Sequence, residues 1–141
     1  MGNHSDLSRF LTAQENIYDQ VVIELEKGQK RSHWMWYIFP QVKGLGSSAT
    51  AKQFALSGLE EAKAYYDHPI LGGRLLECTR LLMNIENPDA DYIFGYPDNL
   101  KLKSSLTLFT EATADPIFEN ALSKYFSGKK DEHTLQLLYQ P

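Results

Sequence analysis

Apolar residues recur at helical spacing along most of this chain. Between residues 7 and 25 they fall at the i, i+3, i+4 and i+7 positions that form one buried helix face. Ser5 or Asp6 is placed to cap the start of this helix, and Gly28 is placed to end it. The pattern predicts one long helix and leaves open a break near Thr12.

Start and stop signals divide the rest of the chain into further helices. We expect them over residues 50–56, 57–67, 69–87, 98–110, 115–128 and 131–138. Ser57 and Glu60 have the spacing of a capping box, and Asp98, Asp115 and Asp131 suit the N-cap position. Segment 89–99 is rich in turn-forming residues and is expected to be a connector. The sequence therefore predicts about seven helices.

Residues 33–39 form a continuous apolar run that Pro40 ends. A run this short fits either a buried strand or a buried helical turn, and its periodicity does not separate the two. A loop with two glycines and two serines follows over residues 41–50. Because no repeat, low-complexity tract or long linker interrupts the chain, we expect a compact all-α array that forms a single domain over residues 1–141.

Composition narrows the class of protein. A chain of 141 residues with 43% hydrophobic residues can bury a substantial core. A net charge of −4 argues against general nucleic-acid binding, and no apolar run approaches the ~20 residues of a membrane span. The N-terminus lacks the pattern of a signal peptide, and the single cysteine, Cys78, lies on an apolar helix face. These features predict a cytoplasmic protein with no membrane association.

Motifs for known cofactors and metals are missing from the sequence. It contains no phosphate-binding loop, dinucleotide fingerprint, zinc-protease motif or nucleophile elbow. The four histidines are scattered, and one cysteine is too few for a typical structural zinc site. We therefore predict neither a cofactor nor a metal. Most acidic residues suit ordinary surface positions, and Glu24 and Glu26 are interpreted as part of a solvated helix face.

The stretch KRSHWMWYIFPQ, residues 30–41, is the best candidate for one wall of a binding site. The indole faces of Trp34 and Trp36 suit a planar ring, and the donors before them suit a phosphate or carboxylate. Alternatively, the tryptophans are core residues and the basic pair is solvated. The potential donors are Lys30, Arg31, Ser32 and His33.

Two later segments are candidates for the other walls of this site. Glycines in the 41–50 loop let the backbone approach a ligand, and Ser47, Ser48 or Thr50 can orient amides toward an anion at the next helix start. Hydroxyls on the 98–110 helix either bond back to helix carbonyls or face a pocket. Asp98 either caps this helix or, together with His33, serves as a catalytic acid–base group. The remaining candidate ligand contacts are Lys43, Gly44, Gly46, Ser47, Lys101, Ser104 and Ser105.

Several long stretches together resemble the domain-of-unknown-function family DUF1810. They are KRSHWMWYIFPQ, GLGSSATAKQFA, HPILGGRLLEC, IFGYPDNLKLKSSLTLF and DEHTLQLL, and they cover nearly the whole chain. The resemblance implies a single, mainly helical domain of bacterial type. It implies no established activity.

A weaker similarity links the chain to the NADAR family. It rests on the order of the aromatic run, AKQFALSGLEEAKAYYDHPILGGRL, ALSKYF and TLQLL. This similarity implies a helical N-glycosidase acting on nucleotide-like substrates, which requires a carboxylate near the scissile bond. The NADAR pattern has a glutamate just after the aromatic segment, whereas residues 39–55 of this chain contain no acidic residue. Asp98 or an acid from another helix would have to replace it.

Two functional hypotheses follow from these observations. In the first, the chain binds a small phosphate-bearing or nucleotide-like ligand, with N-glycosidase activity as its sharper form. In the second, it is a non-catalytic protein-interaction module whose 30–41 segment has a partner-facing rim. The sequence identifies no protein partner for that second hypothesis.

Overall fold

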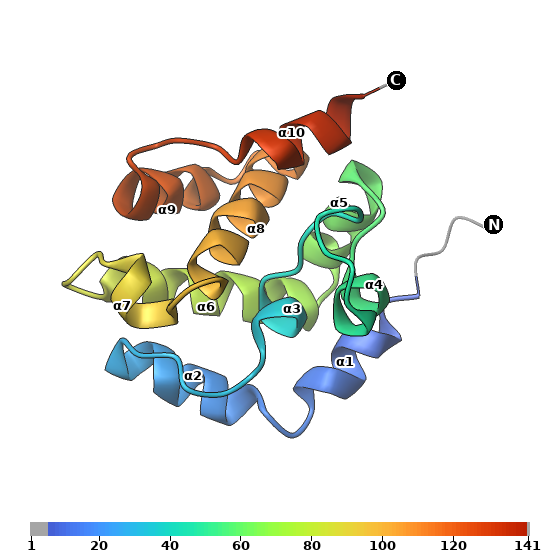
Figure 1. Ribbon diagram of the computed structural model, residues 1–141. Helices are drawn as coiled ribbons and strands as arrows, with labels where there is room; N and C mark the ends of the chain where they lie inside the picture. The colour runs from blue at the N-terminus through green and yellow to red at the C-terminus, as the bar shows by residue number, and fades with distance from the viewer. Residues whose placement is uncertain (1–5, 141) are drawn as a thin grey trace.

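The computed structural model of the protein describes residues 6–140 and is helical, apart from one isolated parallel β-bridge between Val42 and Leu56. This confirms the all-α class. The helices of the described residues surround one core (Figure 1). They are α1 (Ser8–Gln14), α2 (Tyr18–Lys27), α3 (Met35–Ile38), α4 (Ala49–Phe54), α5 (Leu59–Asp67), α6 (Leu71–Asn84), α7 (Ala90–Phe94), α8 (Asp98–Ala112), α9 (Pro116–Phe126) and α10 (Glu132–Tyr139).

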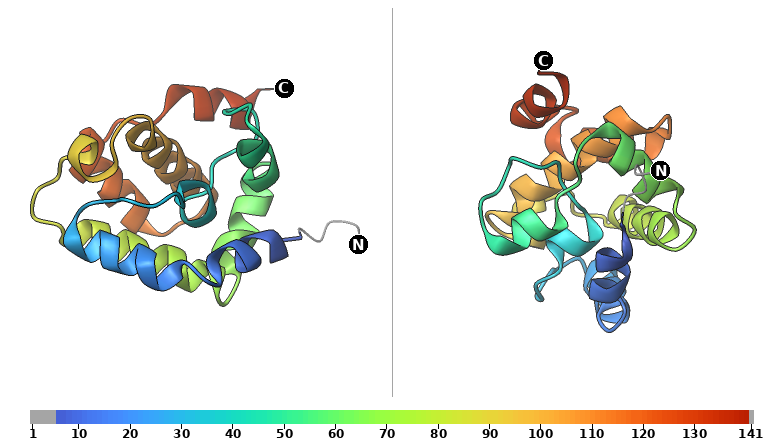
Figure 2. Two further views of the ribbon diagram at one scale, coloured as in Figure 1. Left: turned by 60° about the horizontal axis from the view of Figure 1, so that its bottom comes forward. Right: turned by 90° about the vertical axis from the view of Figure 1, so that its right-hand side faces the viewer.

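The described residues hold ten helices instead of about seven, in part because the first predicted helix is two. The break lies at residues 15–17, just beyond Thr12. Gln14 is fully buried at the end of α1, and its side-chain amide donates to the carbonyl of Tyr37 (2.8 Å) and to Tyr65 Oη (3.0 Å). α1 is thereby fixed against α3, whereas α2 runs along α6 (Figure 2). The two halves separate because they pack on different partners.

The two other additional helices are short. α3 shows that the apolar run of residues 33–39 is a buried helical turn and not a strand. α7 lies inside the segment that we predicted to be a connector, and that prediction was wrong. Asp89 caps α7 by accepting a hydrogen bond from the amide of Tyr92 (3.1 Å), and Gly95 ends it with a φ of 73°.

Most of the predicted helix boundaries are confirmed. Asp115 and Asp131 cap α9 and α10 through their side chains, and Gly28 ends α2 in the left-handed conformation. The predicted capping box was wrong in register, because the amide of Ser57 donates to the next glutamate, Glu61, instead (2.8 Å). The proposed Ser5 cap lies outside the described residues.

α8 runs through the centre of the molecule (Figure 1) and packs against α3, α5, α7, α9 and α10. It is therefore buried on most sides, and several of its hydroxyl-bearing residues are buried as well. A chain of aromatic contacts from Phe10 through Tyr65 and Phe109 to Phe118 crosses the core from α1 to α9. The position of α8 determines where the candidate site lies, because the N-terminal turn of α8 faces the segment that follows α2.

Three smaller observations bear on the expectations from composition. Cys78 is a free, buried thiol on α6. Across residues 6–140, every helix is too short or too polar to cross a lipid bilayer. The same residues contain no group of three or more histidine, cysteine or acidic side chains arranged to hold a metal ion.

Candidate functional site

The segment between α2 and α3 is held in place by Glu24, which is 2% exposed. One carboxylate oxygen accepts hydrogen bonds from the amides of Arg31 (2.8 Å) and Ser32 (3.0 Å) and from the indole N–H of Trp34 (2.9 Å). The other accepts from the Ser32 hydroxyl and from the Gln20 amide. The prediction that Glu24 belongs to a solvated face was therefore wrong. Its side chain organises the turn that precedes the aromatic run.

Burial of Glu24 opposes its ionisation, but the donated hydrogen bonds outweigh that effect. The Ser32 hydroxyl, the two backbone amides and the Trp34 indole lower the pKa of the carboxyl group to about 2. Glu24 is therefore a permanent negative charge at neutral pH. No local sequence pattern marks it, because its partners lie four to ten residues away.

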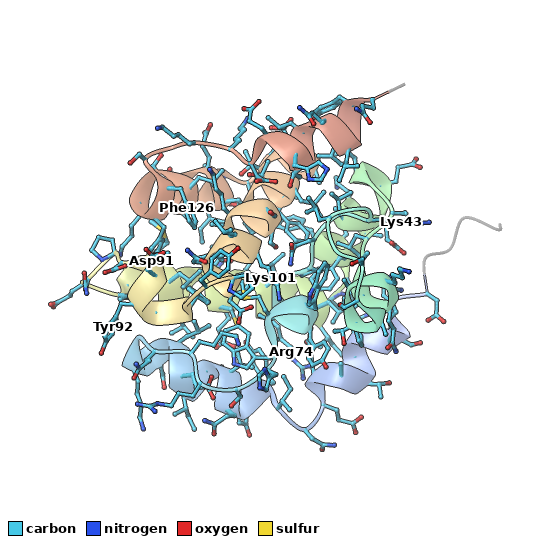
Figure 3. The ribbon with its side chains drawn as sticks, in the orientation of Figure 1. Lys43, Arg74, Asp91, Tyr92, Lys101 and Phe126 are labelled. Carbon is cyan, nitrogen blue, oxygen red and sulfur yellow. The ribbon has the colours of Figure 1, made fainter. Side chains whose placement is uncertain are left out.

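A pocket of about 330 Å³ lies where this segment meets α8 and the start of α4. Its size is near the lower end of the range for small-molecule sites. Figure 3 shows Lys101 of α8 near the middle of this face, beside α3. The pocket is lined by Lys30, His33, Trp34, Met35, Trp36, Tyr37, Ser48, Thr50, Asp98 and Lys101.

Asp98 forms the charged centre of the pocket. It is the first residue of α8, and its two carboxylate oxygens pair with two different lysines. Lys30 Nζ lies 2.8 Å from Oδ2, and Lys101 Nζ lies 3.3 Å from Oδ1. Pro97 occupies the N-cap position, so Asp98 does not cap the helix as predicted. Asp98 and Lys101 are three residues apart on the same helix, whereas Lys30 is brought to Asp98 by the fold.

The two lysines differ in how firmly they are held. The Lys30 side chain is 6% exposed, donates to the carbonyl of Ser32 and lies 5.0 Å from the centre of the Trp34 ring. The Lys101 side chain is 30% exposed, and Asp98 is the partner found for it among the described residues. Lys101 is therefore the cation with more freedom to turn toward the open pocket.

The tryptophans are mainly core residues. Trp34 is 1% exposed and packs against Lys30, Phe39 and Phe94. Trp36 is 8% exposed. Both line the pocket, but side chains buried to this degree do not offer the free indole face that stacking requires. The burial of both tryptophans agrees with the alternative that they are core residues.

The structure brings Lys30, His33, Trp34, Trp36, Asp98 and Lys101 together and leaves the other candidates outside the pocket lining. The Arg31 guanidinium donates to Gln29 Oε1, and the Ser32 hydroxyl is bonded to Glu24. Lys43, Gly44, Gly46 and Ser47 are exposed in the loop before α4. A Cβ at Gly46 would lie 3.2 Å from the Trp36 ring and 2.7 Å from Ala51 Cβ, so this glycine permits close packing.

The two predicted serines on α8 differ. The Ser104 hydroxyl donates to the carbonyl of Leu100, four residues back, and therefore follows the helix-bonding alternative. Ser105 is fully buried, and its hydroxyl has no hydrogen-bond partner among the described residues. Neither serine lines the pocket. A role for either one in ligand binding stays a prediction.

Met35 and Tyr37 were not predicted as ligand contacts, and Ser48 and Thr50 were considered only as residues that orient amides toward an anion. Met35 and Tyr37 lie on α3, which begins just after Trp34, and Ser48 and Thr50 stand at the start of α4. The Ser48 hydroxyl caps α4 by accepting from the amide of Ala51 (3.0 Å). The sequence signal for this wall is the helix cap at Ser48, two residues after Gly46.

Comparisons with known proteins agree with this fold. The family model described as "Protein of unknown function (DUF1810)" matches residues 4–138. The crystal structure of the conserved hypothetical protein Rv1873 from Mycobacterium tuberculosis is 50% identical in sequence, with a TM-score of 0.94. That similarity covers 96% of this chain and 98% of the other. A search of curated proteins finds no match, and none of the comparisons shows the NADAR family. The chain belongs to the DUF1810 family.

Proposed function

We propose that the pocket between α3 and α8 binds a small phosphate-bearing ligand. The observation that carries the proposal is the sharing of one carboxylate, Asp98, by two lysine ammonium groups. Among the described lining residues Asp98 is the one acidic side chain, so the charges of this trio sum to one positive charge. An anion that enters the pocket compensates that excess.

The other lining groups add donors suited to an anion. His33 and Thr50 are exposed at the pocket, and the Ser48 hydroxyl, which accepts from a backbone amide, still has its own proton to donate. The aromatic wall is largely covered, so recognition of a large stacked base contributes little. A volume of about 330 Å³ suits a ligand the size of a sugar phosphate better than a dinucleotide.

Thermal-shift measurements test the proposal, with inorganic phosphate, ribose 5-phosphate, ADP-ribose and NAD as ligands. A ligand at one hundred times its Kd adds about 2.7 kcal/mol, which raises Tm by several degrees. We expect the largest shift with ribose 5-phosphate and its loss in Lys101→Ala. Lys129→Ala is the matched control, because Lys129 is an exposed lysine beyond α9 and outside the pocket.

Two results would contradict the proposal. One is a flat Tm for all four compounds at millimolar concentration. The other is an equal response in Lys101→Ala and the Lys129 control, which would locate the anion elsewhere on the protein. A lower Tm of unliganded Lys101→Ala does not interfere, because the readout is the shift caused by the ligand in each variant.

N-glycosidase activity is the sharper form of the proposal and stays a prediction. It requires a carboxylate oxygen free to accept a proton from water or to stabilise developing positive charge. Both oxygens of Asp98 are paired with lysine ammonium groups. A phosphate that draws Lys101 away would leave Oδ1 available. N-glycosidase activity requires that the protein release nicotinamide from NAD or the base from a nucleoside phosphate. It also requires that Asp98→Asn abolish this release.

The interaction-module hypothesis located partner-facing aromatic residues within residues 30–41. Trp34 and Trp36 are both buried, so they do not provide exposed anchors of that kind. That alternative has no specific observation in its favour at this segment, and it stays an untested prediction.

A further inference from the structure

The two carboxylate oxygens of Asp98 are held with different firmness. Oδ2 lies 2.8 Å from Nζ of Lys30, whose side chain is almost fully buried. That ammonium group also donates to the carbonyl of Ser32 and lies over the Trp34 ring, so these contacts keep it in place. Oδ1 lies 3.3 Å from Nζ of Lys101, whose side chain is partly exposed. Oδ1 is therefore the carboxylate oxygen that a ligand reaches with the smaller rearrangement.

The Asp98 carboxylate has acceptor capacity beyond its two lysine partners. An ionised carboxylate offers about four acceptor positions on its two oxygens. Within residues 6–140, the two ammonium groups are the partners found for it. The side chain is 21% exposed and lines the pocket. A hydroxyl group of a ligand in this pocket can therefore donate to Oδ1, either beside Lys101 or in its place.

Most of the pocket wall is polar. Six of its ten lining side chains carry an ammonium, carboxylate, imidazole or hydroxyl group, and Tyr37 adds a phenol. An apolar ligand that displaces water from such a wall leaves these groups without hydrogen bonds, whereas a hydroxylated ligand replaces them. Trp34 and Trp36 are too buried to stack a planar ring. The wall therefore matches a hydroxylated ligand better than an apolar or aromatic one.

We propose that the pocket selects small sugar phosphates and polyol phosphates, and that Asp98 is the residue that recognises their hydroxyl groups. This specificity rests on the proposed function, in which Lys101 holds the phosphate. A hydroxyl of the same ligand donates to Asp98 Oδ1, while Lys30 stays on Oδ2 and keeps the carboxylate oriented. Asp98 and Lys101 belong to the same turn of α8, so the phosphate and the hydroxyl have to be close neighbours in the ligand.

Asp98 has opposite effects on the two parts of such a ligand. Its negative charge repels the phosphate, whereas its free acceptor positions bind the hydroxyl. Asp98→Asn should therefore tighten the binding of a phosphate ester that lacks hydroxyls, and should remove most of the preference for a hydroxylated ester. Damage to the pocket would instead weaken both esters. The affinity for the hydroxyl-free ester thus separates hydroxyl recognition from a merely structural role.

A matched pair of ligands tests the proposal by amide NMR titration of the 15N-labelled protein. The pair is ribose 5-phosphate and tetrahydrofurfuryl phosphate, which has the same ring and phosphate but lacks the hydroxyls. We expect the wild type to bind ribose 5-phosphate about tenfold more tightly, the effect of one hydrogen bond to a charged acceptor. Asp98→Asn should reduce this preference to about threefold or less, because the neutral amide is a weaker acceptor. Asp19→Asn, an exposed position on α2 outside the pocket, should keep it.

Two outcomes would overturn the role of Asp98 and leave phosphate binding in place. One is an equal affinity of the wild type for the two esters. The other is a full preference kept in Asp98→Asn, which would mean that another side chain recognises the hydroxyls. If neither ester nor inorganic phosphate shifts any amide around the pocket, the proposed function fails as well.

Wild-type spectra decide the question if Asp98→Asn does not fold. The amide shifts that differ between the two esters should then centre on residues 98–101. Differences centred on another part of the protein would contradict hydroxyl recognition by Asp98.

Discussion

Replacing Glu24 with glutamine tests the interaction that holds the 30–41 segment in place. The carboxylate accepts five hydrogen bonds, from Gln20, Arg31, Ser32 and Trp34. Glutamine has nearly the same shape but only one oxygen acceptor. Its N–H group would face donors that the carboxylate now satisfies, so at least one buried donor would lose its partner.

The magnitude follows from the pKa of Glu24. A value of about 2 in the folded protein, against 4.5 for an ordinary glutamate, corresponds to about 3 kcal/mol of stability at neutral pH. The folded-state pKa is lowered, so this contribution is complete above about pH 4.5 and disappears as the pH falls through 2. For a domain of 141 residues, the loss should lower Tm by about 5–15 °C.

The assay is urea denaturation of the wild type and Glu24→Gln at pH 7 and at pH 2.5, with tryptophan fluorescence as the probe. We expect a stability difference of about 3 kcal/mol at pH 7 and a clearly smaller one at pH 2.5. Glu26→Gln, on the exposed side of the same helix, is the control and should change stability by less than about 0.5 kcal/mol. A Glu24→Gln variant as stable as the wild type at pH 7 would refute this account.

Two further predictions concern α6. Gly72→Ala should destabilise the protein by about 1–3 kcal/mol or more, because the new Cβ would lie 1.9 Å from the carbonyl oxygen of Tyr66. The Cβ of Gly73→Ala meets no atom within 4 Å, so this variant should be stabilised by up to ~1 kcal/mol. Thermal unfolding of both variants checks this, and equal Tm values would contradict the predicted contact. Burial raises the pKa of the Cys78 thiol to about 12, so we expect a thiol reagent to leave the native protein unmodified at pH 8 and to react fully in denaturant. Rapid modification of the native protein would show that this part of the core opens readily.

The local elements were largely predictable from the sequence, because their signals are short-range. Asp115 and Asp131 cap their helices through amides two or three residues away, and Gly28 ends α2 through its own backbone conformation. Apolar residues at helical spacing identified most of the buried faces. The predictions failed where a helix is too short for periodicity to show, as in α7, or where a distant contact breaks a continuous pattern, as at Gln14.

The candidate pocket was predictable in part. Segment 30–41 and the 98–110 helix were predicted as two of its walls, and the fold brings six of the predicted residues to one pocket. Their partners within the fold were not predictable. The ion pair between Lys30 and Asp98 spans 68 positions of the chain, and nothing in the sequence separates Glu24, which accepts five hydrogen bonds, from the surface acids.

The sequence by itself determined the all-α class, most helix ends and the segments richest in chemical groups, since these depend on spacing and caps within a few residues. Tertiary structure decided which charges are paired, which aromatic faces are covered and where concave surfaces form. Those properties depend on how α8 packs against its neighbours, and contacts between residues far apart in the chain leave no periodic trace in the sequence. Lys30 and Lys101 illustrate the difference, because both are basic residues in the sequence, but only the fold buries one and leaves the other facing the pocket.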